Sequence, residues 1–197
     1  MKELLVASAN QGKVREIQAL LQDIQINLIT PEELNLFIEV KEDGLTYAEN
    51  AAKKAHIFAR ASGMLTMSDD SGLEVEVLNG APGIYSARFA DQMGATDADR
   101  RNYLLQQLRT YRRPWAARFI CTVALAAPDG AVHFSEGVCQ GEIIPQERGS
   151  NGFGYDPIFL IPELGKTMAE LEMDEKNRRS HRSRAVLAIR PVLLSLL

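Results

Sequence analysis

Cysteine is scarce in this chain, which carries two Cys among its 197 residues. Cys121 and Cys139 are too few for a disulfide framework in a chain of this length, and their spacing is not that of a zinc site. Both lie in β-like runs, so we expect buried thiols. Long apolar runs are also missing, since no stretch reaches the roughly 18 residues of a membrane span. We therefore expect a cytoplasmic protein without a membrane partner.

An excess of positive charge is absent as well. The chain has 22 Lys and Arg against 26 Asp and Glu, which gives a net charge of −4. Proteins that coat nucleic acids are usually basic, so we expect no nucleic-acid partner. The apolar fraction of 46% is ordinary for a globular protein. We treat residues 1–197 as a single domain, because this length supports one sizeable core.

Apolar periodicity predicts alternating strands and helices, followed by a hairpin. The strands are expected at residues 4–7, 26–29, 37–40, 65–68, 73–78, 118–126 and 131–139. Helices are expected after the polar loop 8–13, after the caps Thr46 and Thr96, and from about Ser180 to the end. The turn at 128–130 joins the last two strands. This order predicts an α/β fold with a mixed, elongated central β-sheet flanked by helices.

The loop Ser8-Ala9-Asn10-Gln11-Gly12-Lys13 lies where a strand gives way to a helix. Free N–H groups at a helix N-terminus attract anions, and Lys13 adds a full positive charge. The loop is not a Walker A motif, because Val14 follows where Ser or Thr is needed. It suits a phosphate, although an ordinary capped loop with a solvated lysine would show the same residues.

Adjacent carboxylates occur in Asp69-Asp70-Ser71-Gly72, and Glu42 lies in an acidic turn upstream. Mg²⁺ in proteins is usually held by one or two carboxylates together with substrate phosphates. A carboxylate in such a place can also orient or deprotonate a water molecule. A solvated acidic turn is the simpler alternative.

Two further segments carry candidate binding residues. The loop 149–156 combines three glycines with Phe153, Tyr155 and Asp156, which suits a flat base as well as simple core packing. Residues 176–184 read KNRRSHRSR and form a local basic cluster in an acidic chain, or a basic helix start at the surface. Taken together, the four segments supply what hydrolysis of a nucleoside triphosphate requires.

Five segments resemble the Ham1/RdgB family of inosine/xanthosine triphosphate pyrophosphatases. They are SANQGK at 8–13, DGLTYAENA at 43–51, SDDSGLEVEVLNGAPGIYSARFA at 68–90, GFGYDPIF at 152–159 and SHR at 180–182. The resemblance implies Mg²⁺-dependent cleavage of ITP, dITP and XTP into the monophosphate and pyrophosphate, which removes them before they enter nucleic acid. It also implies a homodimer, and two lobes with the nucleotide in a cleft between them.

The resemblance further implies roles for individual residues. Asp70 is the expected catalytic base and a metal ligand, and Glu42 is the second ligand, with Asp43 as the alternative. Asp69 is expected to support the site through a metal or a lysine. The substrate-binding residues are expected to be Ser8, Ala9, Asn10, Gln11, Gly12, Lys13, Ser71, Phe153, Gly154, Tyr155, Asp156, Lys176, His181 and Arg182.

Base selectivity follows from hydrogen-bond chemistry. Hypoxanthine and xanthine present O6 as an acceptor and N1–H as a donor, whereas adenine reverses both. Arg182 donating to O6 and Asp156 accepting from N1–H would therefore reject adenine, because the wrong base leaves buried polar groups unpaired. Two alternatives remain open: a Maf-type nucleotide pyrophosphatase, and a sensor that binds a purine nucleotide without turnover.

Overall fold

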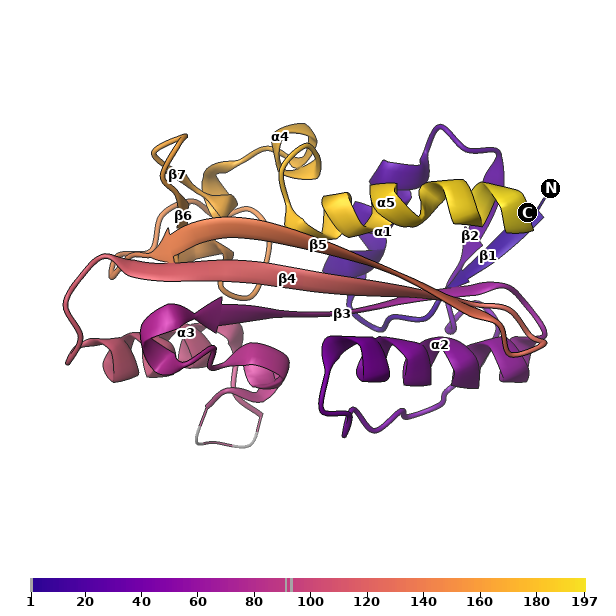
Figure 1. The fold of residues 1–197 in the computed structure, drawn as a ribbon, viewed down its shortest axis with the longest axis horizontal. Helices are drawn as coiled ribbons and strands as arrows, with labels where there is room; N and C mark the ends of the chain where they lie inside the picture. The colour runs from indigo at the N-terminus through magenta and orange to yellow at the C-terminus, as the bar shows by residue number, and fades with distance from the viewer. Residues whose placement is uncertain (1, 91, 93) are drawn as a thin grey trace. The chain divides into compact units, whose positions relative to one another are not determined.

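The computed structural model describes residues 2–90, 92 and 94–197 (Figure 1). Its strands are β1 Lys2–Val6, β2 Ile26–Ile29, β3 Thr66–Val75, β4 Trp115–Ala126, β5 Val132–Ile143, β6 Phe159–Ile161 and β7 Lys166–Thr167. Its α-helices are α1 Gln11–Leu21, α2 Tyr47–Ser62, α3 Asp97–Leu108, α4 Met173–Asn177 and α5 His181–Leu196. Short 3₁₀ turns occupy Glu76–Leu78, Gly83–Arg88, Asp156–Ile158 and Met168–Glu170.

The seven strands form one mixed sheet in the order β2-β1-β3-β4-β5-β6-β7. Strand β1 runs parallel to β2, with Leu4 opposite Leu28, and parallel to β3, with Val6 opposite Met67. Strands β5, β6 and β7 pair antiparallel. Parallel neighbours joined through helices beside an antiparallel part confirm the predicted α/β class.

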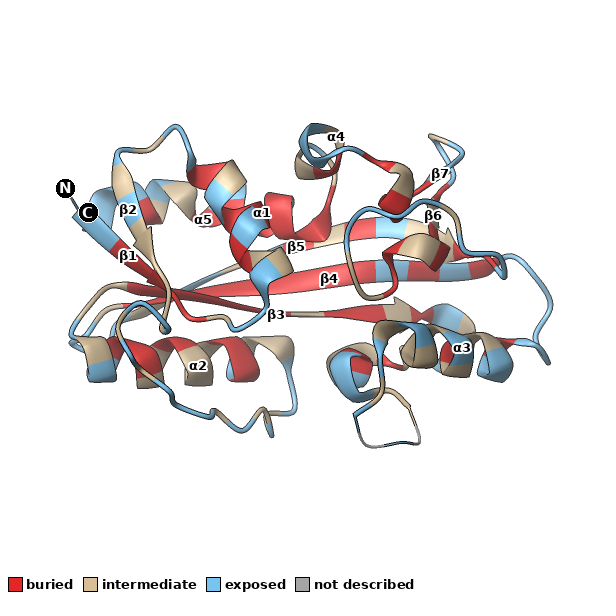
Figure 2. Cartoon of the chain, turned by 180° about the vertical axis from the view of Figure 1, so that it is seen from behind, coloured by how far each residue is buried: buried red, intermediate tan, exposed pale blue. Residues whose placement is uncertain are grey.

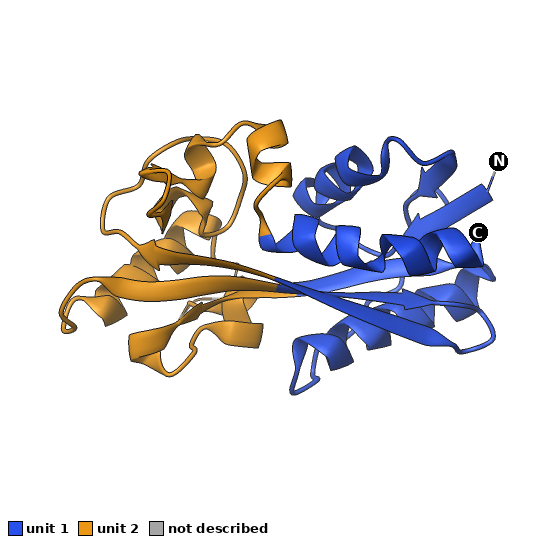
Figure 3. Ribbon diagram, turned by 45° about the horizontal axis from the view of Figure 1, so that its top comes forward, with its two compact units in different colours: residues 1–70, 121–137, 181–197 blue, residues 71–120, 138–180 orange. Residues whose placement is uncertain are grey.

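The chain divides into two compact units (Figure 3). Unit 1 comprises residues 1–70, 121–137 and 181–197, and unit 2 comprises residues 71–120 and 138–180. Strands β3, β4 and β5 contribute residues to both. The cleft expected between two lobes stays a prediction, as does the single domain spanning 1–197.

Unit 1 is built in layers around its strands. Helices α1 and α5 lie on one face and α2 lies on the other (Figure 1). The first face is sealed by Leu4, Val6, Ile17, Val186 and other buried aliphatic side chains. On the second face, α2 packs against β4 through small alanine side chains on both elements. Burial is concentrated on the strands and on the inner sides of these helices (Figure 2).

Unit 2 has its own core, in which Leu104 and Leu108 of α3 pack with residues of β3, β4 and β5 and with residues of the segment 155–171. Trp115, Tyr155 and Phe159 supply large aromatic faces to this core. Helix α3 starts with a complete capping box, in which Thr96 and Asp99 satisfy each other's backbone N–H groups. No helix in the described part of the chain is long and apolar enough to cross a membrane.

The predicted helices and the hairpin are confirmed, but the strand predicted at 37–40 is wrong, and the strand predicted at 73–78 is confirmed only for residues 73–75. Residues 37–40 form no strand, and Phe37 is 81% exposed. A turn after Pro31, closed by the Leu36 N–H on the Pro31 carbonyl at 2.9 Å, leads this segment away from pairing. The strand expected at 73–78 is the end of β3, which runs unbroken through both aspartates and gives way to a 3₁₀ turn at Glu76.

Candidate active site

Asp69 and Asp70 lie in the middle of β3, in unit 1. Successive side chains of a strand point to opposite faces, so the two carboxylates are directed apart. Asp69 meets residues of α1 and α5, whereas Asp70 meets Asn50 of α2. The repulsion of neighbouring charges is thereby relieved by the strand itself and by separate partners on each face.

The Asp69 face holds a dense, buried ion network. Its Oδ2 lies 3.0 Å from the Lys13 Nζ and accepts hydrogen bonds from the Arg182 Nε at 3.2 Å and Nη2 at 3.0 Å. The Arg182 Nη1 donates to the Glu16 Oε2 at 2.5 Å. Asp69, Glu16 and Arg182 are all at least nine-tenths buried. Two carboxylates and two cations therefore balance in this network.

The charge state of Asp69 is set by these cations. Burial alone would raise the pKa of Asp69, but Lys13, Arg182 and Lys54 outweigh it and hold the pKa well below its usual range. Cys121 on β4 donates its thiol to the same carboxylate at 3.8 Å. Burial, reinforced by that negative charge, raises the pKa of this thiol far above its ordinary value, so Cys121 stays neutral.

Arg182 is brought to this face by the close approach of α5 to β5. A Cβ at Gly137 would lie 2.1 Å from the His181 carbonyl oxygen and 2.5 Å from the Ala185 nitrogen, so only glycine fits there. The Ser135 hydroxyl donates to the Ala185 carbonyl at 2.7 Å. His181 and Arg182 are thus fixed at the first turn of α5 with their side chains buried.

The predicted phosphate loop closes the start of α1. Asn10 is the N-cap, and its Oδ1 accepts from the N–H groups of Gly12 at 2.9 Å and Lys13 at 3.1 Å. The Ser8 hydroxyl accepts from the Asn10 N–H at 3.2 Å. Asn10 thus satisfies the N–H groups at the start of α1, and the predicted binding of phosphate by this loop stays a prediction.

On the other face, Asn50 connects Asp70 to the acidic turn. Its Nδ2 donates to the Asp70 Oδ2 at 3.1 Å, and its Oδ1 accepts from the Gly44 N–H at 2.8 Å. Burial raises the pKa of Asp70, and Glu42 adds to this against the opposing charge of Lys54. Asp70 is thereby less acidic than an exposed aspartate, in the direction that suits a proton acceptor.

Lys54 of α2 ties Glu42 to β3. Its Nζ donates to the Glu42 Oε1 at 2.5 Å and to the Asp69 carbonyl at 2.8 Å. Burial would lower the pKa of Lys54, but the carboxylates of Asp69, Asp70 and Glu42 outweigh it and raise that pKa. Asp43 points elsewhere, to Lys53 at 2.5 Å. Glu42, rather than Asp43, therefore shares the electrostatic environment of Asp70.

The donor set of this face fits Mg²⁺ held together with a substrate. Within residues 2–90, 92 and 94–197, no three His, Cys, Asp or Glu side chains gather into a metal cluster. Two neighbouring carboxylates, Asp70 and Glu42, influence each other's charge. Mg²⁺ commonly uses one or two protein carboxylates and completes its shell with phosphates and water, so more protein ligands are not required.

In unit 2, the Gly-rich loop is organised around a buried ion pair. The Asp156 Oδ2 lies 2.7 Å from the Lys176 Nζ and accepts from the Phe153 N–H at 3.0 Å. Both charged side chains are about 5% exposed. The Lys176 Nζ also lies 5.1 Å from the centre of the Phe153 ring, in cation–π contact. The pair fixes the start and the end of the segment 153–156.

Gly152 makes this arrangement possible. Its φ is +77°, a backbone conformation that favours glycine, and a Cβ there would lie 2.0 Å from the Asp156 Oδ2. Tyr155 turns the other way, into the core, where its hydroxyl donates to the Ser86 carbonyl at 2.9 Å. Tyr155 is 5% exposed, so its ring packs in the hydrophobic core.

Comparison with known proteins identifies the family to which this chain belongs. The family model described as the Ham1 family matches residues 4–192. The chain belongs to the Ham1 family. A protein of Desulforamulus reducens named dITP/XTP pyrophosphatase is 44% identical over 184 residues, covering 93% of this chain and 92% of its own. A protein of the same name from Nostoc sp. is 46% identical over 198 residues, covering 100% and 96%.

A solved Ham1 structure shares the fold. The HAM1 protein from Coxiella burnetii superposes with a TM-score of 0.89 at 40% sequence identity, and the match covers 99% of this chain and 100% of that one. The architecture described above is therefore that of the Ham1 family, as the sequence motifs predict.

The structure of this Ham1 chain brings several of the predicted residues together. Asp70 and Glu42 lie around Lys54 on one face of β3. Lys13, Arg182 and Asp69 meet in unit 1, and Asp156, Lys176 and Phe153 meet in unit 2. Arg182 is 1% exposed and held by two carboxylates, so reading a base would require its surroundings to move. The base contact of Arg182 stays a prediction, and its observed role is to neutralise Asp69 and Glu16.

Sequence reasoning missed Glu16, Asn50 and Lys54. The signal for Glu16 is its place on the buried stripe of α1, next to Ile17 and one turn before Leu20. Asn50 and Lys54 are likewise one turn apart on α2, bordering its buried alanines. An ionisable or amide side chain on an apolar helix face indicates a buried partner, although it does not identify that partner.

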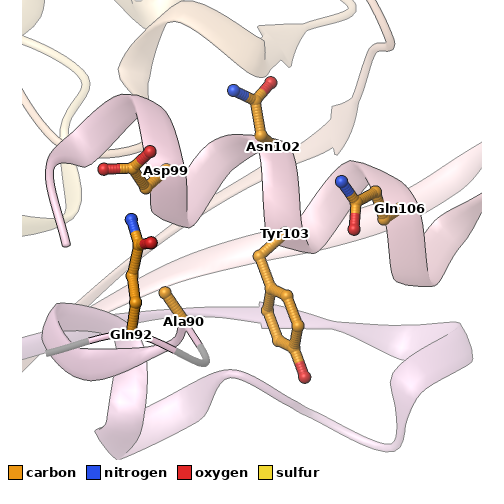
Figure 4. Close-up of a pocket in the computed structure, with 6 residues that line it drawn as sticks. All are labelled: Ala90, Gln92, Asp99, Asn102, Tyr103 and Gln106. Carbon is orange, nitrogen blue, oxygen red and sulfur yellow. The ribbon is translucent and has the colours of Figure 1, made fainter.

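One cavity lies apart from all of these residues. Its volume is about 490 Å³. Most of the side chains that line it are polar (Figure 4). It is lined by Ala90, Gln92, Asp99, Asn102, Tyr103 and Gln106. None of the predicted site residues lines it, so this cavity is not part of the candidate site.

Proposed function

We propose that this Ham1-family protein hydrolyses non-canonical purine nucleoside triphosphates, namely dITP, XTP and ITP, to the monophosphate and pyrophosphate. The relatives named dITP/XTP pyrophosphatase support this substrate class. The single structural observation that carries the proposal is Asp70, a buried carboxylate held by Asn50 beside Glu42 and Lys54. A carboxylate so placed can accept a proton from water, which a protein that only binds nucleotide does not need.

The phosphate end of the substrate would be bound in unit 1. Lys13 and the start of α1 offer a positive charge and helix N–H groups to phosphate oxygens. Asp69 and Arg182 hold Lys13 in place through the buried network. Ser8 and Asn10 would give up their present hydrogen bonds for the ligand.

The reaction requires a proton acceptor and compensation of negative charge. Asp70 would take a proton from water, and the water oxygen would bond to the α-phosphorus. The bond from that phosphorus to the oxygen bridging the α- and β-phosphates would break, and this oxygen would leave with pyrophosphate. Asp70 and Glu42 would hold Mg²⁺, which when bound supplies positive charge for the phosphate oxygens. The ammonium groups of Lys13 and Lys54 add fixed positive charge nearby.

The base would be bound by the loop of unit 2. Phe153 offers a flat ring, and Asp156, fixed by Lys176, offers a carboxylate acceptor for N1–H. Adenine has no hydrogen at N1 and would leave such an acceptor unpaired. A homodimer in the cytoplasm, with no nucleic-acid or membrane partner, belongs to the same proposal and is supported by the family resemblance and by the acidic composition.

The test is product analysis with dITP, ITP, XTP, GTP, ATP and the pyrimidine nucleotides CTP and UTP in Mg²⁺, in which pyrophosphate and orthophosphate are measured separately. We expect monophosphate and pyrophosphate from dITP, ITP and XTP, and little turnover of ATP. Release of orthophosphate would contradict the cleavage position. Turnover of pyrimidine triphosphates in preference to these purines would favour the Maf-type alternative, and tight binding without turnover would favour the sensor.

A further inference from the structure

The peptide groups that flank Gly154 are held from outside the loop by helix α3. The Gly154 N–H donates to the Asp97 Oδ2 at 2.7 Å, and the Gly154 carbonyl accepts from the Arg101 Nη1 at 2.8 Å. Asp97 and Arg101 are one turn apart on α3, so both reach the same residue of the loop. Both contacts lie within unit 2.

Each of the two side chains is itself held in place. Arg101 directs its Nε and Nη2 to the two carboxylate oxygens of Glu147, at 2.7 and 3.0 Å, in the forked geometry that fixes a guanidinium plane. The other carboxylate oxygen of Asp97 pairs with Arg100. The Arg101 side chain is 12% exposed, so its contact with Gly154 is largely shielded from water.

The Asp156–Lys176 pair fixes the two ends of the loop, and the contacts from α3 hold its middle. Gly152 and Gly154 both have positive φ, and glycine visits many other conformations at little cost. Ordering a flexible segment at the moment of binding reduces affinity, whereas a segment ordered in advance avoids that loss. Gly154 is adjacent to Phe153, whose N–H is hydrogen-bonded to Asp156. Fixing Gly154 therefore also fixes the ring of Phe153 and the carboxylate of Asp156.

We propose that Asp97 and Arg101 are positioning residues for the purine-binding loop, which they hold through Gly154 in its binding conformation. This inference rests on the proposed function, because it assigns the loop 153–156 to the base. Neither residue is among those that sequence reasoning assigned to the site. Their loss would weaken substrate binding while leaving Asp70 and the phosphate-binding residues of unit 1 unchanged.

The chain offers a matched control for this proposal. Asp99 lies two residues after Asp97 in the same first turn of α3, and its carboxylate caps the helix by accepting from the Thr96 N–H at 2.8 Å. Asp97→Ala and Asp99→Ala each remove one negative charge from the start of α3, but only the first removes the acceptor for Gly154. Asp97→Asn retains an oxygen that can accept this hydrogen bond.

The experiment combines hydrogen exchange with steady-state kinetics on dITP. We expect Asp97→Ala to lose amide protection at Gly154 and to raise the KM by about tenfold, with kcat changed less than about twofold, as for a loss of uniform binding. Asp97→Asn should recover much of the KM. Asp99→Ala, which removes a cap of α3 but not the acceptor for Gly154, should change protection and KM much less than Asp97→Ala. Arg101→Lys keeps the positive charge but loses the forked contact with Glu147, so it should raise the KM as well. It provides the same test if Asp97→Ala fails to fold.

Three results would overturn the proposal. The first is loss of Gly154 protection with an unchanged KM, and the second is an equal effect of Asp99→Ala. The third is a fall in kcat with a constant KM, since that would place the effect on the chemical step. Absence of purine triphosphate turnover in the unmodified protein would instead refute the proposed function, and the exchange contrast between Asp97→Ala and Asp99→Ala would still decide whether α3 holds the loop.

Discussion

Asp69 and Arg182 are 113 positions apart in the sequence, yet they share two hydrogen bonds in the centre of unit 1, each with a side chain 1% exposed. Arg182 also forms an ion pair with Glu16, so one guanidinium neutralises two buried carboxylates. Removing one partner of a buried ion pair leaves an uncompensated charge in a medium of low polarity. Arg182 is therefore an anchor of the fold as well as a candidate site residue.

Arg182→Met should destabilise the protein strongly. It leaves Asp69 and Glu16 buried without their shared cation, and losses of about 3–5 kcal/mol in the free energy of unfolding are typical of such a change. Arg190→Met is the matched control, because Arg190 lies on the same helix but pairs with Asp23 at the surface. We expect only a small change there. Urea unfolding of both variants measures the difference, and equal losses would show that the buried contacts of Arg182 add no more stability than the surface pair of Arg190.

Asp70→Asn should abolish most turnover while nucleotide binding survives. Asparagine keeps the size of the side chain and an oxygen that can accept from Asn50, but it cannot take a proton from water. Loss of a general base typically costs about 10²–10⁴-fold in rate. Measurement of kcat for dITP together with direct binding of dITP checks this, and full activity of the variant would refute the assignment of the base.

Glu42→Gln and Asp43→Asn should differ in their dependence on Mg²⁺. Glu42 contributes to the electrostatic environment of Asp70, whereas Asp43 pairs with Lys53 and is half exposed. We expect Glu42→Gln to raise the Mg²⁺ concentration for half-maximal activity by at least about tenfold. Replacing a side chain that only supports a metal ligand already lowers metal affinity by about that factor. Asp43→Asn should leave it unchanged. The reverse pattern would make Asp43 the ligand.

Local signals in the sequence predict the helices well, because caps and buried stripes are encoded within a few residues. Thr46 and Thr96 cap α2 and α3 as predicted. The prediction of a strand at 37–40 is wrong, because a short apolar run does not indicate whether a partner strand is available. In the structure, Phe37 faces solvent. Strand formation depends on pairing that lies elsewhere in the chain.

The aspartate pair shows the same limit within the candidate site. The sequence patterns predict one strand before the aspartates, at 65–68, and another after them, at 73–78, with a break between the two. The strand continues, because alternation directs Asp69 to Lys13 and Arg182, and Asp70 to Asn50. Motifs identify which side chains belong to a site, but the ion pairs that join distant segments follow only from the fold.

Gly152→Ala should impair binding of dITP more than its backbone strain explains. A Cβ at Gly152 would lie 2.0 Å from the Asp156 Oδ2 and 3.0 Å from the Lys176 Nζ, so the buried pair must move. Gly165→Ala is the control, because Gly165 also has a positive φ, +62°, but an added Cβ there meets nothing within 4 Å. Both variants should lose about 1–2 kcal/mol of stability through the left-handed backbone, and Gly152→Ala should lose more, because it also displaces a buried ion pair.

Only Gly152→Ala should raise the KM for dITP, by about tenfold, because it displaces the carboxylate that is proposed to accept from the base. Unfolding experiments measure the loss of stability in each variant, and steady-state kinetics measure the difference in KM. An unchanged KM in Gly152→Ala would mean that the position of Asp156 does not govern binding. The base would then have to be recognised by residues outside the Asp156–Lys176 pair.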